Sequence, residues 1–215
     1  MGCDIHLYVE KKNPVTNQWD KIGPVFFDNW RAGYIEKEIK EIYGLDDDET
    51  WEVMEKYRKG DPPSNRTEQY IINKHFPGRI AKENLGMWDA EQIGLLASPF
   101  TDSPYNGRCY SLFGILSNVR NYSNPMIGTE EIEHPKGLPD DSSLDILQMS
   151  DEWGDDAHSH NYFTVGELLD SSYAKMDNEE LNRLGIDPYF FMKVVPTLLE
   201  LGKKNEVRIV FWFDN

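Results

Sequence analysis

The first residues of the chain alternate between apolar and polar side chains, and this alternation predicts a half-buried strand over residues 3–10. Its apolar face carries Cys3, Ile5, Leu7 and Val9. The turn residues Asn13 and Pro14 follow, so we expect a hairpin whose second arm covers residues 18–22. The opening segment is therefore predicted to form a β-hairpin.

The closing segment, residues 207–213, is apolar on both faces, which is typical of a central strand. Several segments between the two strands follow helical spacing. The expected helices cover 34–43, 48–58, 67–75, 90–97, 111–119, 143–150, 164–169 and 187–201. We predict a single α+β domain over residues 1–215. In it, a mixed β-sheet joins the N- and C-terminal strands and is covered by helices, with a helical subregion at about 34–75 that supplies no metal ligands.

Several local signals mark where helices begin and end. Thr164 and Glu167 have the spacing of a capping box, and Asp187 before Pro188 predicts a second helix start. We expect Pro196 to kink that second helix and Gly202 to end it. Asp48 and Ser111 are the N-caps expected for two other helices. Residues 121–141 are rich in Pro, Gly and Asn and predict a long loop.

Charge narrows the possible partners. The 215 residues include 22 Lys and Arg against 38 Asp and Glu, a net charge of −16. Such a charge disfavours direct binding to duplex nucleic acid, but it allows a bound metal ion or docking onto a basic partner, and solubility alone also explains it. We expect a soluble, cytoplasmic protein without a membrane span, because no window approaches the ~18 apolar residues needed and two cysteines provide no disulfide framework.

Asp4 and His6 lie two positions apart on the first strand, so both project from one face. Carboxylate oxygen and imidazole nitrogen are both ligands of zinc and manganese, and the pair is a candidate half of a metal site. A solvent-facing strand with two polar residues has the same spacing.

The segment before Thr164 contains a second cluster, Asp155-Asp156-Ala157-His158-Ser159-His160. In an extended segment His158 and His160 fall on one side, and the helix that follows can hold an anion at its N-terminus. We consider His158 and His160 as metal ligands, with Asp156 and His160 as catalytic residues. A solvated acidic loop containing two histidines is the alternative.

Two arginines and one further carboxylate complete the candidates. Arg108 and Arg120 flank the helix at 111–119 and are candidate phosphate ligands, although ion pairs with carboxylates would also explain them in so acidic a chain. Asp214 follows the central strand, where a ligand or general base is often found. Phosphate-binding loops, dinucleotide fingerprints, nucleophile elbows and zincin motifs do not occur in the sequence.

Several segments together resemble a family of uncharacterised bacteriophage- and prophage-encoded proteins. They are Met1-Gly2-Cys3-Asp4-Ile5-His6, residues 110–121, Gly137-Leu138-Pro139, His158-Ser159-His160 and residues 207–215. The resemblance implies a phage-encoded accessory protein that acts in the host bacterial cytoplasm, with interference with host defence as a possible role. It transfers no catalytic residue.

Two functions follow from these observations. The first is a metal-dependent phosphoester hydrolase, with Asp4, His6, His158 and His160 around one divalent ion and a small phosphorylated ligand as substrate. The second is a non-catalytic acidic binding protein that inhibits a host protein or sequesters a small signal. The first function requires the two histidine pairs to lie close together, and the second does not.

Overall fold

The computed structural model describes residues 2–23, 26–27, 40, 43–50, 52–53, 66, 100–121 and 129–214. The chain divides into two compact units. One consists of Met1–Gly23 with Asp102–Asn215, and the other of Pro24–Thr101. Each unit is considered by itself.

The first unit is built on a four-stranded sheet. Its strands are β1 (Ile5–Lys12), β2 (Trp19–Lys21), β5 (His158–Thr164) and β6 (Val207–Phe213), in the order β2-β1-β6-β5. The predicted α+β class and the pairing of the N- and C-terminal strands are confirmed. We expected a mixed sheet, but all three pairings are antiparallel.

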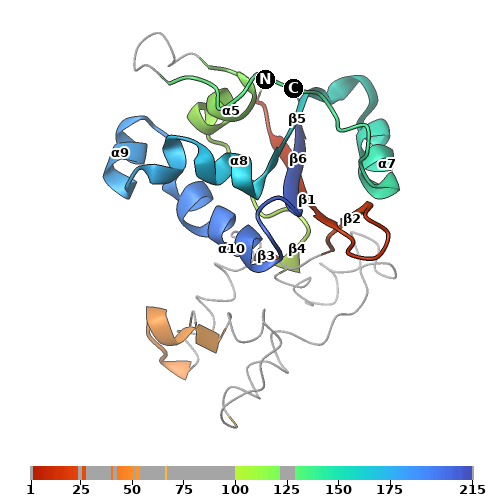
Figure 1. The fold of residues 1–215 in the computed structure, drawn as a ribbon. Coiled ribbons are helices and arrows are strands. Elements are labelled where there is room, and N and C mark those ends of the chain that lie inside the picture. Colours follow the sequence, from red (N-terminus) through yellow and green to blue (C-terminus); the bar gives the residue numbers. More distant parts are fainter. Residues whose placement is uncertain are drawn as a thin grey trace, which may run out of the picture. The chain divides into compact units, whose positions relative to one another are not determined.

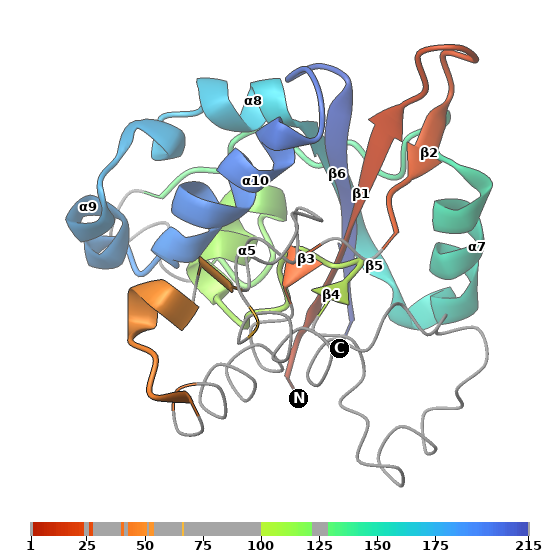
Figure 2. The ribbon, with the colours of Figure 1, turned by 90° about the horizontal axis from the view of Figure 1, so that it is seen from below.

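Helices cover both faces of this sheet. They are α5 (Tyr110–Ser117), α7 (Leu144–Trp153), α8 (Val165–Asp170), α9 (Asn178–Arg183) and α10 (Val195–Glu200). Helices α5, α8 and α10 lie on one face and α7 on the other, as two perpendicular views show (Figures 1 and 2). A 3₁₀ turn, Gly154–Asp156, continues α7, and a second, Tyr173–Lys175, follows α8.

The two faces of the sheet differ in chemistry. Every residue of β6 is buried, and its side chains alternate, so Phe211 and Phe213 point toward α5 while Val210 and Trp212 pack with Ile146 of α7. On the α7 face the register also places polar side chains of β1 beside β6, with Glu10 opposite Arg208 and His6 opposite Trp212. The candidate chemistry therefore gathers under α7.

The local helix signals agree with the structure at most positions. Thr164 accepts the Glu167 N–H, and the Glu167 side chain bonds the Thr164 N–H, which confirms the capping box of α8. Helix α5 begins two residues earlier than expected, because the extended residue Cys109 rather than Ser111 is its N-cap. Near Pro196 the helix contains a π-helical turn, Phe190–Val194, in which the Val195 N–H bonds the Phe190 carbonyl.

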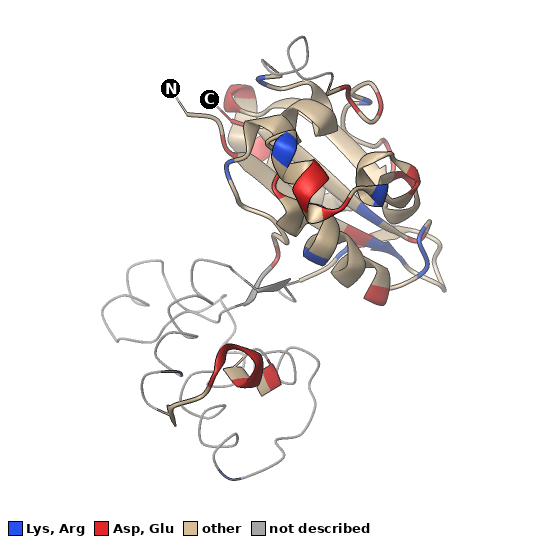
Figure 3. Ribbon diagram, turned by 90° about the vertical axis from the view of Figure 1, so that its left-hand side faces the viewer, with Lys and Arg blue, Asp and Glu red and all other residues tan. Residues whose placement is uncertain are grey.

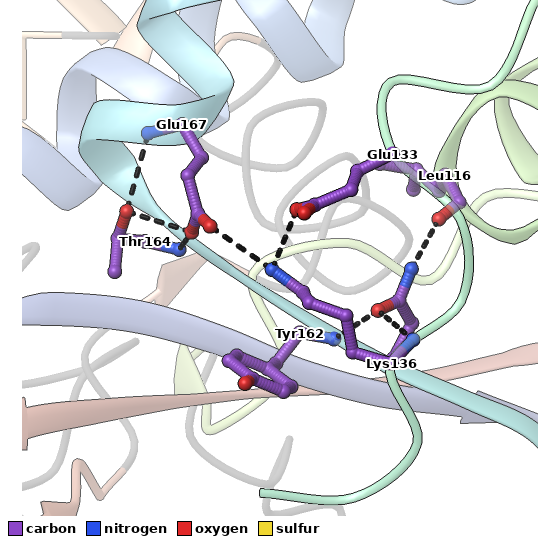
Figure 4. Close-up of polar contacts among 7 residues, drawn as sticks. Leu116, Glu133, Lys136, Tyr162, Thr164 and Glu167 are labelled. Carbon is purple, nitrogen blue, oxygen red and sulfur yellow. Dashed lines mark hydrogen bonds and ion pairs between the residues drawn. The ribbon is translucent and has the colours of Figure 1, made fainter.

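The loop at 129–141 is fixed to the sheet by Lys136 (Figure 4). Its ammonium lies 3.0 Å from Glu167 Oε1, 2.9 Å from Glu133 Oε2 and 4.3 Å from the Tyr162 ring centroid. Burial opposes the charge of Lys136, but the bonds to Glu133 and Glu167 outweigh it and raise its pKa. Asn161 adds a second attachment, since its Oδ1 accepts the Lys136 N–H and its Nδ2 donates to the Leu116 carbonyl. The predicted long loop is thus ordered over its described part.

In the second unit, β3 (Phe26–Phe27) pairs antiparallel with β4 (Phe100–Thr101). Residues 47–50 are helical, and the cap is Asp46 rather than the expected Asp48, because Asp46 Oδ1 accepts the Glu49 N–H at 2.9 Å. The helices predicted at 67–75 and 90–97 lie outside the described residues, as does most of the helical subregion at 34–75. Over the described ranges, no helix has both the length and the apolar character needed to cross a bilayer.

Candidate functional site

The α7 face of the sheet holds polar groups at both ends of the helix. At its C-terminal end, His6 of β1 and His160 of β5 lie on either side of Trp212 of β6, with ring centroids 6.2 and 5.7 Å from the indole. Trp153, the last residue of α7, packs against His6 with ring centroids 4.0 Å apart and the rings tilted by 38°. The two histidines therefore occupy one layer between the sheet and α7, separated by a buried tryptophan.

His6 and Asp214 form a pair where the two ends of the chain meet. His6 Nε2 lies 3.2 Å from Asp214 Oδ2, and Asp214 Oδ1 accepts the Asp4 N–H at 2.8 Å. Burial favours the neutral acid, but the Asp4 N–H and His6 outweigh it and lower the pKa of Asp214. The sequence identified Asp214 as a possible ligand or base, and the structure brings it to His6.

The side chain of Asp4 turns away from this pair. It accepts two bonds from Arg108, at 2.7 Å from Nε and 2.6 Å from Nη2. Arg120 lies over the Tyr110 ring at 5.5 Å and hydrogen-bonds Cys3, whose pKa is raised because burial outweighs that bond. Both arginines flank α5 as expected. The guanidinium of Arg108 forms an ion pair with Asp4, which is the alternative to phosphate binding that the sequence left open.

His160 is bonded to α7 rather than to the carboxylates of its own segment. Its Nε2 lies 2.8 Å from Oγ of Ser150, a buried residue on the sheet-facing side of the helix. Burial, with a smaller contribution from His158, lowers the pKa of His160. A neutral imidazole accepts a hydrogen bond from the Ser150 hydroxyl or donates one to it, according to its tautomer, so the contact is compatible with the lowered pKa of His160. Asp156 is exposed in the 3₁₀ turn.

The two-residue spacing predicts that His158 and His160 share one side of β5, but in the structure they lie on opposite sides. The strand has a register irregularity between His158 and Asn161, and Ser159 adopts the left-handed conformation with φ +54°. His158 consequently lies opposite Phe213, whose ring it stacks on at 6.3 Å, whereas His160 contacts Trp212 on the other face. A bulge of this kind reverses the alternation that the prediction assumed.

The structure therefore does not join Asp4, His6, His158 and His160 into one ligand set. Over the part of the chain that the structure describes, no group of three His, Cys, Asp or Glu side chains has the arrangement to hold a metal ion. The donor atoms of Asp4, His6 and His160 bond to Arg108, Asp214 and Ser150 instead.

A groove of about 660 Å³ lies at the other end of α7, between the β1–β2 hairpin and the first turn of the helix. The residues that line it come from two segments, Asn17, Gln18, Trp19, Asp20 and Lys21, and Asp141, Ser142, Ser143, Leu144 and Asp145. Three aspartates thus face one lysine, and that lysine is paired with Asp102 at 2.8 Å. The groove is acidic.

A buried ion network forms the support of this groove. Arg208 Nε donates to Glu10 Oε2 and its Nη1 to Asp141 Oδ1, both at 2.7 Å. The guanidinium also lies 4.0 Å from the Trp19 ring centroid, and the Trp19 N–H donates to Asp141 at 2.9 Å. Burial favours neutral Asp141, but Arg208 and Trp19 outweigh it and lower its pKa. These contacts fix the wall of the groove before any ligand binds.

Sequence reasoning missed this groove. Two signals pointed to it: Glu10 continues an alternating strand, and Arg208 interrupts a strand that is otherwise apolar on both faces. A charge at such a position requires a buried partner. Comparison of the chain with family models, curated proteins and solved structures finds no match.

Proposed function

We propose that the protein is a non-catalytic acidic binding protein that receives a basic segment of a partner protein in the groove beside α7. The observation that carries the proposal is the set of aspartates from two segments around a rigidly supported hollow. Complementary charge steers association and fixes orientation. The resemblance to phage-encoded proteins makes a host protein the partner that we propose.

The lining selects the chemistry of the bound segment. Leu144 is 82% exposed at the edge of the groove, and Asp145 beside it has no hydrogen-bond or ion-pair partner among the described contacts. Asp20 accepts one bond, from the Asn13 amide, and keeps acceptor capacity. An exposed leucine next to an unpaired carboxylate suits a Lys or Arg side chain. The methylene stem of such a side chain packs against the leucine, and its charged end reaches the carboxylate.

Net charge alone does not define a docking surface. Basic and acidic positions both occur on the described elements of the opposite side of this unit, which carries α8, α9 and α10 (Figure 3). The groove differs because its single lysine is already neutralised by Asp102. A cation in the groove therefore meets two carboxylates, Asp20 and Asp145, that no cation among the described residues neutralises.

The test uses a short oligoarginine peptide and an oligocitrulline peptide of the same length, which keeps the shape and removes the charge. The variant D20N/D145N is compared with D155N/D156N, which removes two exposed carboxylates of the 3₁₀ turn and changes the net charge equally. We expect oligoarginine affinity to fall at least about tenfold, or 1.4 kcal/mol, in the groove variant only. Equal loss in both variants would show attraction by net charge and reject the groove, as would equal binding of oligocitrulline.

Metal-dependent phosphoester hydrolysis is the competing proposal, with zinc or manganese as cofactor. The observation in its favour is the His6–Asp214 pair beside Asp4 and Arg108. Elemental analysis of protein purified without a histidine tag decides it. One equivalent of bound metal, lost in H6A, would favour the hydrolase, and metal-free protein that lacks phosphodiesterase activity with added zinc or manganese would reject it.

A further inference from the structure

A second cavity, of about 340 Å³, lies away from the α7 face. It is open to solvent on one side and lies between the segment 130–132, the 3₁₀ turn after α8 and the end of α9. Its lining residues are Glu130, Glu131, Ile132, Ser171, Ser172, Tyr173, Met176, Arg183 and Leu184. The volume is at the lower end of the ~300–1,000 Å³ that small-molecule sites occupy.

The walls of the cavity are held together by Tyr173. Its hydroxyl donates to the Glu130 carbonyl at 2.7 Å and accepts the Glu130 N–H at 2.9 Å, so both backbone groups of Glu130 are used. The ring is nearly buried and stacks on Phe191 at 6.3 Å. On the other side of the segment, the Ile132 N–H donates to the Ile115 carbonyl of α5. The cavity is therefore preformed.

Two opposite charges line this cavity, and one of them is incompletely satisfied. Glu131 uses Oε1 to bond His134, at 3.2 Å, while its Oε2 is buried without a donor. Arg183 is exposed at the rim and forms no ion pair among the described residues. A buried acceptor without a donor costs roughly 1–3 kcal/mol, more for a charged group, and a guanidinium offers a planar fork that matches a carboxylate. One ligand can supply the donor that Glu131 lacks and a carboxylate for the guanidinium of Arg183.

We propose that this cavity binds a small zwitterion of the amino-acid type, with its ammonium on Glu131 Oε2 and its carboxylate on Arg183. The carboxylate of the ligand neutralises the guanidinium, and the ammonium gives Glu131 the donor that the chain does not provide. Met176 and Leu184 line the remaining wall and accept an aliphatic side chain. This inference is independent of the groove beside α7, because the two sites share no residue.

The experiment compares three probes that differ by one charged group. L-norvaline carries both charges, butylamine lacks the carboxylate and pentanoate lacks the ammonium. Binding to the full chain is followed by NMR, with the amides of Glu131 and Tyr173 as reporters. We expect saturable shifts at these amides with norvaline, and affinities at least about tenfold lower for either single-charge probe, which corresponds to 1.4 kcal/mol.

Variants assign each charge to its residue. R183Q should weaken norvaline at least tenfold and leave butylamine unchanged, whereas E131Q should weaken norvaline and leave pentanoate unchanged. K203Q removes an exposed cation elsewhere and should change nothing. No saturable shift with norvaline, equal binding of all three probes, or shifts confined to other residues would each overturn the proposal. Amide spectra of the free variants establish that each remains folded.

Discussion

Glu10 and Arg208 lie directly opposite each other on neighbouring strands, and Arg208 Nε donates to Glu10 Oε2 over 2.7 Å. Both side chains are almost fully buried, at 0% and 4% exposure. The second carboxylate oxygen of Glu10 accepts the N–H of Ser143, the N-cap of α7, at 2.6 Å. One buried pair thus connects β1, β6 and the helix that covers them.

Removing one partner of this pair should destabilise the fold strongly. R208M leaves the Glu10 carboxylate buried without its counter-ion, and we expect a loss of about 3–5 kcal/mol in the free energy of unfolding. Urea denaturation measures it. The double variant E10L/R208M should recover part of the loss, because no buried unpaired charge then remains: Asp141 also loses Arg208, but its side chain is 65% exposed. A loss below about 1 kcal/mol in R208M would contradict the buried network.

Stability should fall as the solution is acidified through the range where His160 titrates. The lowered pKa of His160 means that the folded chain binds this proton less readily than the unfolded chain. Its contribution is therefore present above the ordinary histidine pKa of about 6.5 and is lost as the pH falls below that value. Urea unfolding between about pH 8 and 5 should show a smaller slope in H160Q than in the parent protein, with the exposed H134Q as control. An NMR pKa at or above 6.5 for His160 would contradict this.

The capping box of α8 provides a local stability test. T164A removes the oxygen that accepts the Glu167 N–H at 3.2 Å, and we expect a cost of about 1 kcal/mol. T164S keeps that oxygen and should recover most of the loss. Thermal or urea unfolding of T164A and T164S separates the contribution of the capping oxygen from that of the threonine methyl group. Equal destabilisation of the two variants would assign the effect to packing of the methyl group.

The His6–Asp214 pair should contribute little to stability. Its side chains are 18% and 22% exposed, so water screens the attraction, and we expect D214N to cost less than about 1 kcal/mol. The asparagine can still accept the Asp4 N–H, which makes the change specific to charge. Urea denaturation checks this value. A loss above about 2 kcal/mol would indicate that the pair, rather than strand pairing, holds the chain ends together.

The sequence by itself determined the elements whose information is local. The alternation in β1, the two apolar faces of β6 and the Thr164–Glu167 box each depend on a few neighbouring residues, and each appears in the structure. The apolar positions of a strand or helix mark the face that it must bury, and they do so independently of the sequence elsewhere in the chain. The joining of β1 and β6 followed from the same argument, because both strands needed a sheet. The antiparallel direction of every pairing did not follow from it.

Only the tertiary structure decided which chemical groups meet. Ser159 adopts φ +54° at a bulge, and this single irregularity sends His158 and His160 to opposite faces, although two-residue spacing places them together. The contact of Arg208 with Asp141 joins residues 67 positions apart, and that of Trp19 with Asp141 joins residues 122 apart. Strand register sets such meetings, and a slip of one residue reverses every side chain in a strand. Periodicity identifies which residues are buried, but it does not specify their partners.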